Sequence, residues 1–129
     1  MKLRHIVFGG SGTLGSELIL QLAARLEEVI VCDYQPPTNQ KVLMSPFVQF
    51  VKISLTNEES FNRIATSAND VVHHLGAQQD LPLTTKAQGV ELYWSAIYVS
   101  TKNILRFMCE RRLRKLVYFG TDYVYGYSE

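Results

Sequence analysis

Three glycines near the amino terminus have the spacing of a loop that binds a phosphate group. Gly9, Gly12 and Gly15 follow a short apolar run, residues 5–8, and open a stretch with helical periodicity. The first glycine allows a tight turn, the second lets the backbone approach a pyrophosphate, and the third lets helix and strand pack closely. Free amides of the first helical turn then point at the anion. The loop therefore predicts a dinucleotide site.

An aspartate follows the second apolar run. Asp33 comes directly after residues 29–32. A carboxylate at the tip of this strand accepts hydrogen bonds from both hydroxyls of the adenosine ribose and repels a 2′-phosphate. Since no basic residue lies in the glycine loop or just after Asp33, the pattern favours NAD over NADP as the cofactor. The alternative is a structural turn followed by a solvated aspartate.

Strands and helices must alternate along the chain to position these residues. We expect strands at residues 5–8, 29–32, 48–51, 70–75 and 116–119, and helices at residues 11–26, 56–67 and 91–112. Strands this apolar, alternating with helices, indicate a parallel sheet covered on both faces. Right-handed crossovers then favour the strand order 3-2-1-4-5. The prediction is one α/β domain over residues 1–129 with a Rossmann-like, doubly wound sheet.

The periodicity also predicts details of the helices and connections. Thr56 is expected to cap the second helix, and residues 35–45, which contain two prolines, are expected to form a loop. Leucines that recur every four residues predict the buried face of the first helix. These are Leu14, Leu18, Leu22 and Leu26.

Composition and charge favour an ordinary soluble domain. Apolar residues make up 47% of the 129 residues and charged residues 19%. With 13 basic and 12 acidic residues, net charge favours neither a nucleic acid nor an anionic membrane as partner. No apolar run reaches the length of a membrane span, and the first residues lack the apolar core of a signal peptide. We therefore expect a cytoplasmic location.

The side chains that commonly bind metals do not form a site pattern. Cys32 and Cys109 lie far apart and are interpreted as reduced thiols. His73 and His74 alternate across a buried strand, so they cannot both bind one ion there. The basic residues at 111–115 are interpreted as a helix end that complements the helix dipole, rather than as a nucleic-acid patch. We expect no metal.

Five stretches resemble, in order and spacing, the extended short-chain dehydrogenases/reductases, the group of NAD-dependent epimerases/dehydratases and 3β-hydroxysteroid dehydrogenases. They are residues 7–15, Asp33, residues 70–77, residues 100–105 and residues 116–126. The resemblance implies that the turn after the fourth strand lines the cofactor. It also implies a contact near the adenine after the third strand, where Ser54-Leu55 stands in place of the family's Asp-Leu or Asp-Ile pair. The predicted cofactor contacts are Gly9, Gly12, Thr13, Leu14, Gly15, Asp33, Ser54, Leu55, Leu75, Gly76 and Ala77.

Thr121 falls on the catalytic serine or threonine of that family. The resemblance implies that its hydroxyl bonds the substrate oxygen at which hydride is transferred. Tyr123 stands where sugar-nucleotide dehydratases have a glutamate, which argues against dehydration. The family's catalytic Tyr-x-x-x-Lys comes later than Thr121, and the sequence ends at Glu129 before it. We therefore expect a Rossmann fold that is incomplete at its carboxyl terminus.

A literal Tyr-x-x-x-Lys does occur earlier, at Tyr98 and Lys102. It precedes Thr121 and lies in the predicted helix 91–112, which in the resembled family packs on the sheet and contributes to a dimer interface. We interpret Tyr98 as an interface residue and expect a homodimer through this helix.

Two functions fit these observations. The first is the NAD-binding domain of an epimerase/dehydratase-type oxidoreductase that acts on a hydroxyl or keto group of a sugar nucleotide or sterol-like substrate. The second is a truncated, non-catalytic module that binds NAD(H) or a partner protein. A Tyr-x-x-x-Lys encoded downstream of Glu129 would favour the first function.

Overall fold

The computed structural model describes residues 2–76 and 94–120, and five strands in them form one parallel sheet. The sheet order is β3-β2-β1-β4-β5, which confirms the predicted order. The strands are β1 (Arg4–Phe8), β2 (Glu28–Asp33), β3 (Val48–Lys52), β4 (Val71–His74) and β5 (Lys115–Tyr118).

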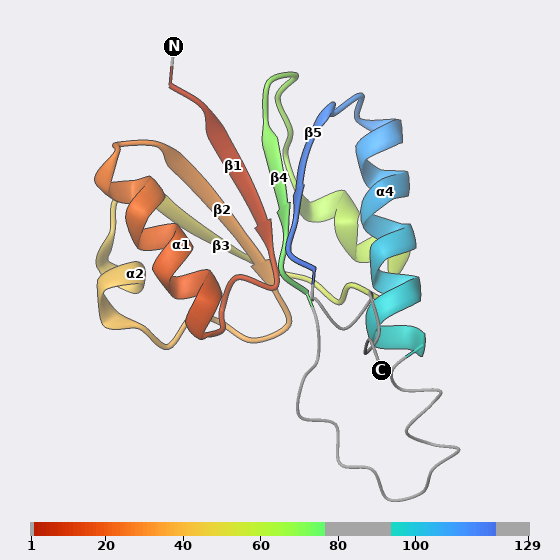
Figure 1. Ribbon diagram of the computed structural model, residues 1–129, viewed down its shortest axis with the longest axis horizontal. Coiled ribbons are helices and arrows are strands. Elements are labelled where there is room, and N and C mark those ends of the chain that lie inside the picture. Colours follow the sequence, from red (N-terminus) through yellow and green to blue (C-terminus); the bar gives the residue numbers. More distant parts are fainter. Residues whose placement is uncertain (1, 77–93, 121–129) are drawn as a thin grey trace, which may run out of the picture.

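Helices cover both faces of the sheet, as predicted for a Rossmann-like fold (Figure 1). On one face lie α1 (Thr13–Ala24) and α2 (Gln40–Met44). On the other lie the 3-10 helix η1 (Glu58–Arg63) and α4 (Ser100–Glu110), which continues from a π-helical turn, η2 (Trp94–Val99). Each face has its own apolar core, and alternate residues of the central strands enter one core or the other.

The buried face of α1 differs from the predicted leucine stripe. Leu22 is buried and Leu18 packs against the core, but Leu14 is 59% exposed and Leu26 is 50% exposed. A spacing of four residues drifts by about 40° per step around a helix of 3.6 residues per turn. Leu26 in addition lies beyond the helix, in the left-handed backbone region with φ of 61°. Ile19, which the stripe omits, is fully buried.

Two connections were predicted wrongly. Residues 35–45 contain the short helix α2, because the Asn39 side chain accepts hydrogen bonds from the amides of Lys41 and Val42 and caps it. The expected helix over residues 56–67 is only η1, and its cap is Asn57, whose side chain accepts from the amide of Glu59. Thr56 instead shares a hydrogen bond with Ser54.

The basic residues near the end of α4 do not complement the helix dipole as predicted. The helix ends at Glu110, and its last turn carries no basic residue. Arg112 takes the left-handed conformation that terminates the helix, with φ of 57°. The guanidinium of Arg111 turns away to the carbonyl of Ile64 and to the ring of Phe107. None of the helices in residues 2–76 and 94–120 has the length and apolarity needed to cross a bilayer.

Candidate cofactor-binding site

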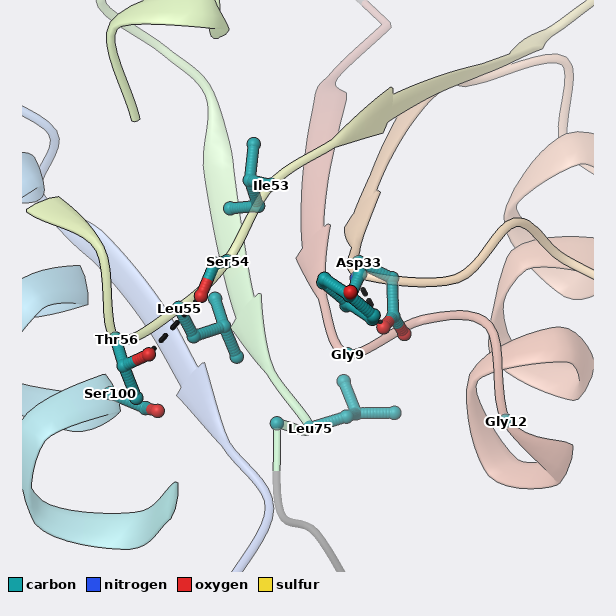
Figure 2. Close-up of a pocket in the computed structure, with 11 residues that line it drawn as sticks. Gly9, Gly12, Asp33, Ile53, Ser54, Leu55, Thr56, Leu75 and Ser100 are labelled. Atoms are coloured by element: carbon teal, nitrogen blue, oxygen red, sulfur yellow. Dashed lines mark hydrogen bonds between the residues drawn. The ribbon is translucent and has the colours of Figure 1, made fainter. Parts of the chain in front are cut away.

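A cleft of about 470 Å³ lies at the carboxyl ends of strands β1 to β4. Figure 2 shows that its walls come from the ends of these strands and from the start of α4. Ligands of open parallel sheets bind at this edge, where the strand order reverses. The lining residues are Gly9, Gly12, Asp33, Tyr34, Ile53, Ser54, Leu55, Thr56, Leu75, Gly76 and Ser100.

Most of the residues predicted from sequence meet in this cleft, although they come from four separate segments. The residues brought together are Gly9, Gly12, Asp33, Ser54, Leu55, Leu75 and Gly76. Thr13, Leu14 and Gly15 form the first turn of α1 beside the cleft and are not among its lining residues. Ala77 and Thr121 lie outside the residues that the structure describes.

The glycine loop touches the turn that follows β4. Gly9 has φ of +73°, a conformation that side chains rarely adopt. A Cβ atom added to Gly9 would lie 2.5 Å from the Cα atom of Gly76. The loop after β1 and the turn after β4 are therefore in direct backbone contact, and a side chain at Gly9 would separate them.

The amino terminus of α1 is open toward the cleft. Gly12 occupies the cap position, no side chain caps the helix, and its first turn carries no acidic residue. The first-turn amides of an α-helix lack partners within the helix and attract anions. A Cβ added to Gly12 would meet no atom within 4 Å, so the chain is open beside Gly12, which lines the cleft. This arrangement fits a pyrophosphate.

Gly15 packs differently from the prediction. A Cβ added there would overlap the carbonyl oxygen of Gly10. The missing side chain therefore lets α1 approach the glycine loop itself, rather than the neighbouring strand. Gly10 in turn contacts Val7, Val31 and Ile19 at the foot of the loop.

Asp33 holds its carboxylate at the rim of the cleft through backbone hydrogen bonds. The amide of Ser11 donates to Oδ2 at 3.0 Å, and the amide of Tyr34 donates to Oδ1 at 2.7 Å. The amide of Gln35 also lies 3.5 Å from Oδ1. Asp33 is only partly buried and lines the cleft, so its carboxylate is accessible to a further hydrogen-bond donor there. The two amides thus orient the carboxylate at the cleft, as a ribose-binding acid requires.

A basic residue that sequence reasoning overlooked lies next to Asp33. Lys52 pairs with Asp33 across strands β2 and β3, and its ammonium group lies 5.1 Å from the centre of the Tyr34 ring. Lys52 lies neither in the glycine loop nor just after Asp33 in the sequence. Strand register places Lys52 beside Asp33, and register is not visible in the local pattern.

The segment after β3 contributes four successive residues to the cleft, two more than predicted. The hydroxyls of Ser54 and Thr56 lie 3.1 Å apart, and the carbonyl of Leu55 accepts a 2.9 Å hydrogen bond from the Asn103 side chain of α4. Ile53 is buried beneath them. The carboxyl ends of parallel strands share one edge of the sheet, so the position of Ile53 and Thr56 after β3 was enough to predict that they line the cleft. The position of Ser100 in the cleft depends on how α4 packs and could not be predicted in this way.

The two histidines of β4 lie on opposite faces of the sheet, as predicted. His73 contacts His5 with nitrogens 2.9 Å apart, and His74 contacts Thr101 of α4 at 2.8 Å. Within residues 2–76 and 94–120, no group of three metal-ligating side chains is close enough to hold an ion. Tyr98 and Lys102 are both exposed, and neither lines the cleft.

Comparison with known proteins gives a single family. The model of the NAD dependent epimerase/dehydratase family matches residues 5–129. A UDP-N-acetyl-alpha-D-glucosaminuronate decarboxylase of Bacillus cytotoxicus is 28% identical over 128 residues, 98% of this chain. A UDP-glucose 4-epimerase of Halalkalibacterium halodurans is 29% identical over 94% of the chain.

Solved structures give the same result. The UDP-glucose 4-epimerase of Thermus thermophilus, in complex with NAD, is 25% identical, with a TM-score of 0.70 over 88% of this chain. The chain spans 39% and 35% of the length of the two curated relatives and 36% of that structure. The fold, the open helix terminus with its neighbouring aspartate, and the family match agree, and the chain belongs to the NAD-dependent epimerase/dehydratase family.

Proposed function

We propose that residues 1–129 form the NAD(H)-binding domain of an epimerase/dehydratase-type oxidoreductase acting on a sugar nucleotide. One observation carries the proposal: the uncapped amino terminus of α1 and the oriented carboxylate of Asp33 face the same cleft. When bound, NAD supplies a hydride acceptor or donor for a hydroxyl or keto carbon. The relatives, which are named for UDP-sugar chemistry, favour a sugar nucleotide over a sterol-like substrate.

Different lining residues of the cleft are proposed to bind different parts of NAD. The amides of the first turn of α1, approached past Gly12, hold the pyrophosphate. Asp33 accepts hydrogen bonds from the adenosine ribose. Ser54 and Thr56 offer hydroxyls to the adenine edge, and Leu75 with Gly76 lines the path from the pyrophosphate toward the nicotinamide.

Thr121 is the proposed catalytic residue of this chain. Its hydroxyl would bond the substrate oxygen and polarise the carbon to which hydride is transferred. This role depends on the family resemblance of the segment that follows β5.

We also propose that the protein forms a homodimer through η2 and α4. Ile97, Tyr98 and Leu105 are large apolar side chains on these elements with between 44% and 50% of their surface exposed. Exposed apolar residues gathered on one helix favour a protein partner. A cytoplasmic location remains part of the proposal, and the free thiols of Cys32 and Cys109 support it.

Isothermal titration calorimetry with NAD, NADH and NADP tests the cofactor assignment. We expect saturable binding of NAD and NADH and weaker binding of NADP, because Asp33 repels a 2′-phosphate. Adenosine monophosphate, which lacks the pyrophosphate, serves as the control ligand and should bind more weakly than NAD. Equal or tighter binding of NADP would refute the assignment of NAD.

A further inference from the structure

His74, the last residue of β4, uses both nitrogens of its imidazole ring to join two parts of the cleft. The side chain is 3% exposed. The backbone amide of Gly76 donates to Nδ1 at 3.2 Å. Nε2 lies 2.8 Å from the hydroxyl of Thr101 in α4, and that hydroxyl donates to the carbonyl of Ile97 at 2.6 Å. The chain of hydrogen bonds therefore runs from the turn after β4 to the π-helical turn before α4.

The partners of His74 determine where its proton lies. An amide can only donate, so Nδ1 must be unprotonated to accept from Gly76. The hydroxyl proton of Thr101 is already directed at Ile97, so Nε2 must carry the hydrogen and donate to that hydroxyl. These bonds define one tautomer of the neutral ring, protonated at Nε2.

The residue held by Nδ1 belongs to the wall of the cleft. Gly76 lines the cleft and is in backbone contact with Gly9 of the glycine loop. A Cβ added to Gly76 would overlap the side chain of Leu55, so this turn is packed between the segments that follow β1 and β3. At the other end of the hydrogen-bond chain, Ser100, the neighbour of Thr101, also lines the cleft. Movement of the Gly76 amide would therefore change three walls of the site.

We propose that His74 is a positioning residue for the dinucleotide: it holds the Leu75–Gly76 turn against the glycine loop and anchors that turn to the start of α4. The proposal rests on the proposed function, since it assumes that the cleft binds NAD(H). His74 does not line the cleft and acts on the ligand only through Gly76.

Protonation of His74 opposes this role. An imidazolium donates from both nitrogens and cannot accept from Gly76, so the turn loses its anchor. His74 is flanked by Phe8 of β1, by Thr101 of α4 and by Tyr118 of β5. The centroids of the His74 and Tyr118 rings are 5.2 Å apart, and Tyr118 is the titratable residue among these three. Burial lowers the pKa of His74, and no charged group of the described residues contributes to the shift. NAD affinity should therefore fall only below about pH 6.5, the ordinary pKa of histidine.

Calorimetry with NAD on a set of variants tests the role. His74→Asn keeps an acceptor at the Nδ1 position and cannot titrate, whereas His74→Phe removes the acceptor. We expect His74→Phe to bind NAD about tenfold more weakly at pH 7.5, the effect of about one lost hydrogen bond, and His74→Asn to bind within about threefold of the wild type. His73→Gln, on the opposite face and equally buried, should leave NAD affinity unchanged. Unchanged affinity in His74→Phe would overturn the proposal.

The pH profile separates positioning from a structural effect. Between pH 7.5 and 5.0, with folding verified by circular dichroism at each pH, the wild type should lose NAD affinity and His74→Asn should keep it. A parallel fall in both proteins would show that another group is responsible and would overturn the proposal.

Nuclear magnetic resonance gives a readout that does not depend on NAD. Long-range ¹H–¹⁵N correlation of the histidine rings should show His74 as the Nε2–H tautomer, and the Gly76 amide should exchange with solvent at least about tenfold faster in His74→Phe than in His74→Asn. Failure of the wild type to bind NAD would refute the proposed function, and these two measurements would then decide the role of His74. An Nδ1–H tautomer or equal exchange rates would reject that role.

Discussion

At the scale of single residues, Asp33 holds the glycine loop with the same carboxylate that is proposed to bind the ribose. Its carboxylate accepts hydrogen bonds from the amides of Ser11 and Tyr34. These bonds fix the orientation of the carboxylate, which is only partly buried and lines the cleft. Loss of the side chain therefore affects both the loop and the ribose contact, and a test must separate the two effects.

The binding affinities of an Asp33 variant for NAD and for NADP separate the effect on the loop from the effect on the ribose contact. Asp33→Ser should weaken NAD binding by about 10-fold to 100-fold, because hydrogen bonds to a charged group contribute about 1.5–3 kcal/mol. NADP binding should be retained or should increase, since the repulsion is removed and Lys52 lies beside the site. Glu28→Ser, at the exposed opposite end of β2, is the control. Calorimetry that shows equal losses for both cofactors would assign Asp33 a role in the loop alone.

Two glycines of the loop should respond oppositely to substitution. Gly12→Ser introduces a side chain into free space, in an extended conformation that suits a serine cap, so thermal stability should be unchanged or higher by about 0.5 kcal/mol. Its hydroxyl occupies the amides of α1, so NAD affinity should fall at least about tenfold. Gly15→Ala overlaps Gly10 and should cost about 1–3 kcal/mol of stability.

Thermal unfolding and calorimetry on the same two proteins check this contrast. If Gly12→Ser binds NAD normally, the pyrophosphate does not sit at the end of α1. If Gly15→Ala is as stable as the wild type, the close approach of α1 to the loop is not required.

At the scale of elements, a buried chain of polar groups joins β1, β4 and the segment after α1, away from the cleft. Nε2 of His5 is hydrogen-bonded to the carboxylate of Glu27, and Nδ1 of His5 lies 2.9 Å from Nε2 of His73. The hydrogen bond from His5 lowers the pKa of Glu27. Burial, and then the charge of His5, lowers the pKa of His73 to about 4. The second nitrogen of His73 is buried and has no partner among the described residues.

This chain should make folding stability depend on pH. Between about pH 6.5 and 4, His73 is protonated in the unfolded chain but not in the folded protein. The contribution of His73 to the free energy of unfolding is therefore complete above about pH 6.5 and is lost as the pH falls. The contribution of Glu27, whose pKa is lowered, is lost at still lower pH. From pH 7.5 to 5.0, His73 should account for at most about 2 kcal/mol, because each pH unit of unequal proton binding corresponds to about 1.4 kcal/mol.

Urea unfolding at pH 7.5, 6.0 and 5.0 measures this loss. His74, whose pKa burial also lowers, acts in the same direction, so the informative quantity is the difference between the wild type and His73→Gln. The variant keeps a polar atom at the Nε2 position and should show a shallower loss. Identical slopes would mean that His73 does not titrate as described.

At the scale of the whole molecule, two of the exposed apolar surfaces on the described residues are relevant to self-association. One lies on η2 and α4, with Tyr98 and Leu105 exposed. The other is β5, an edge strand of the described sheet, in which all four residues are exposed, Val117 by 42%. Exposed strand edges offer unpaired backbone groups to another chain, and exposed helix faces offer side chains. Both surfaces are therefore candidates for self-association, and one substitution on each distinguishes them.

Analytical ultracentrifugation should find a dimer that depends on α4. Leu105→Glu places a charge on the exposed helix surface and should shift the protein to a monomer at concentrations where the wild type is a dimer. Val117→Lys, a matched charge on the edge strand, should leave the dimer intact. The reverse pattern would place the interface on β5, and a monomeric wild type would show the dimer prediction to be wrong.

Much of the architecture could be predicted because its signals are local. Five apolar runs located the strands to within a residue or two, and alternation with helices led to the sheet order that is observed. The errors fell on short connections and on helix faces. α2 depends on a single capping side chain, Asn39, and the buried face of α1 depends on where Gly15 lets the helix approach. Periodicity alone carries neither kind of information.

The sequence by itself determined the glycine loop, the aspartate at the tip of β2 and the parallel order of strands, because spacing along the chain sets turn geometry and crossovers. Only the tertiary structure decided which distant segments meet. Lys52 lies beside Asp33 through strand register, and Ser100 reaches the cleft through the packing of α4. The hydrogen bond between His74 and Thr101 likewise joins residues far apart in sequence. Such contacts depend on how strands and helices pack, which no local pattern specifies.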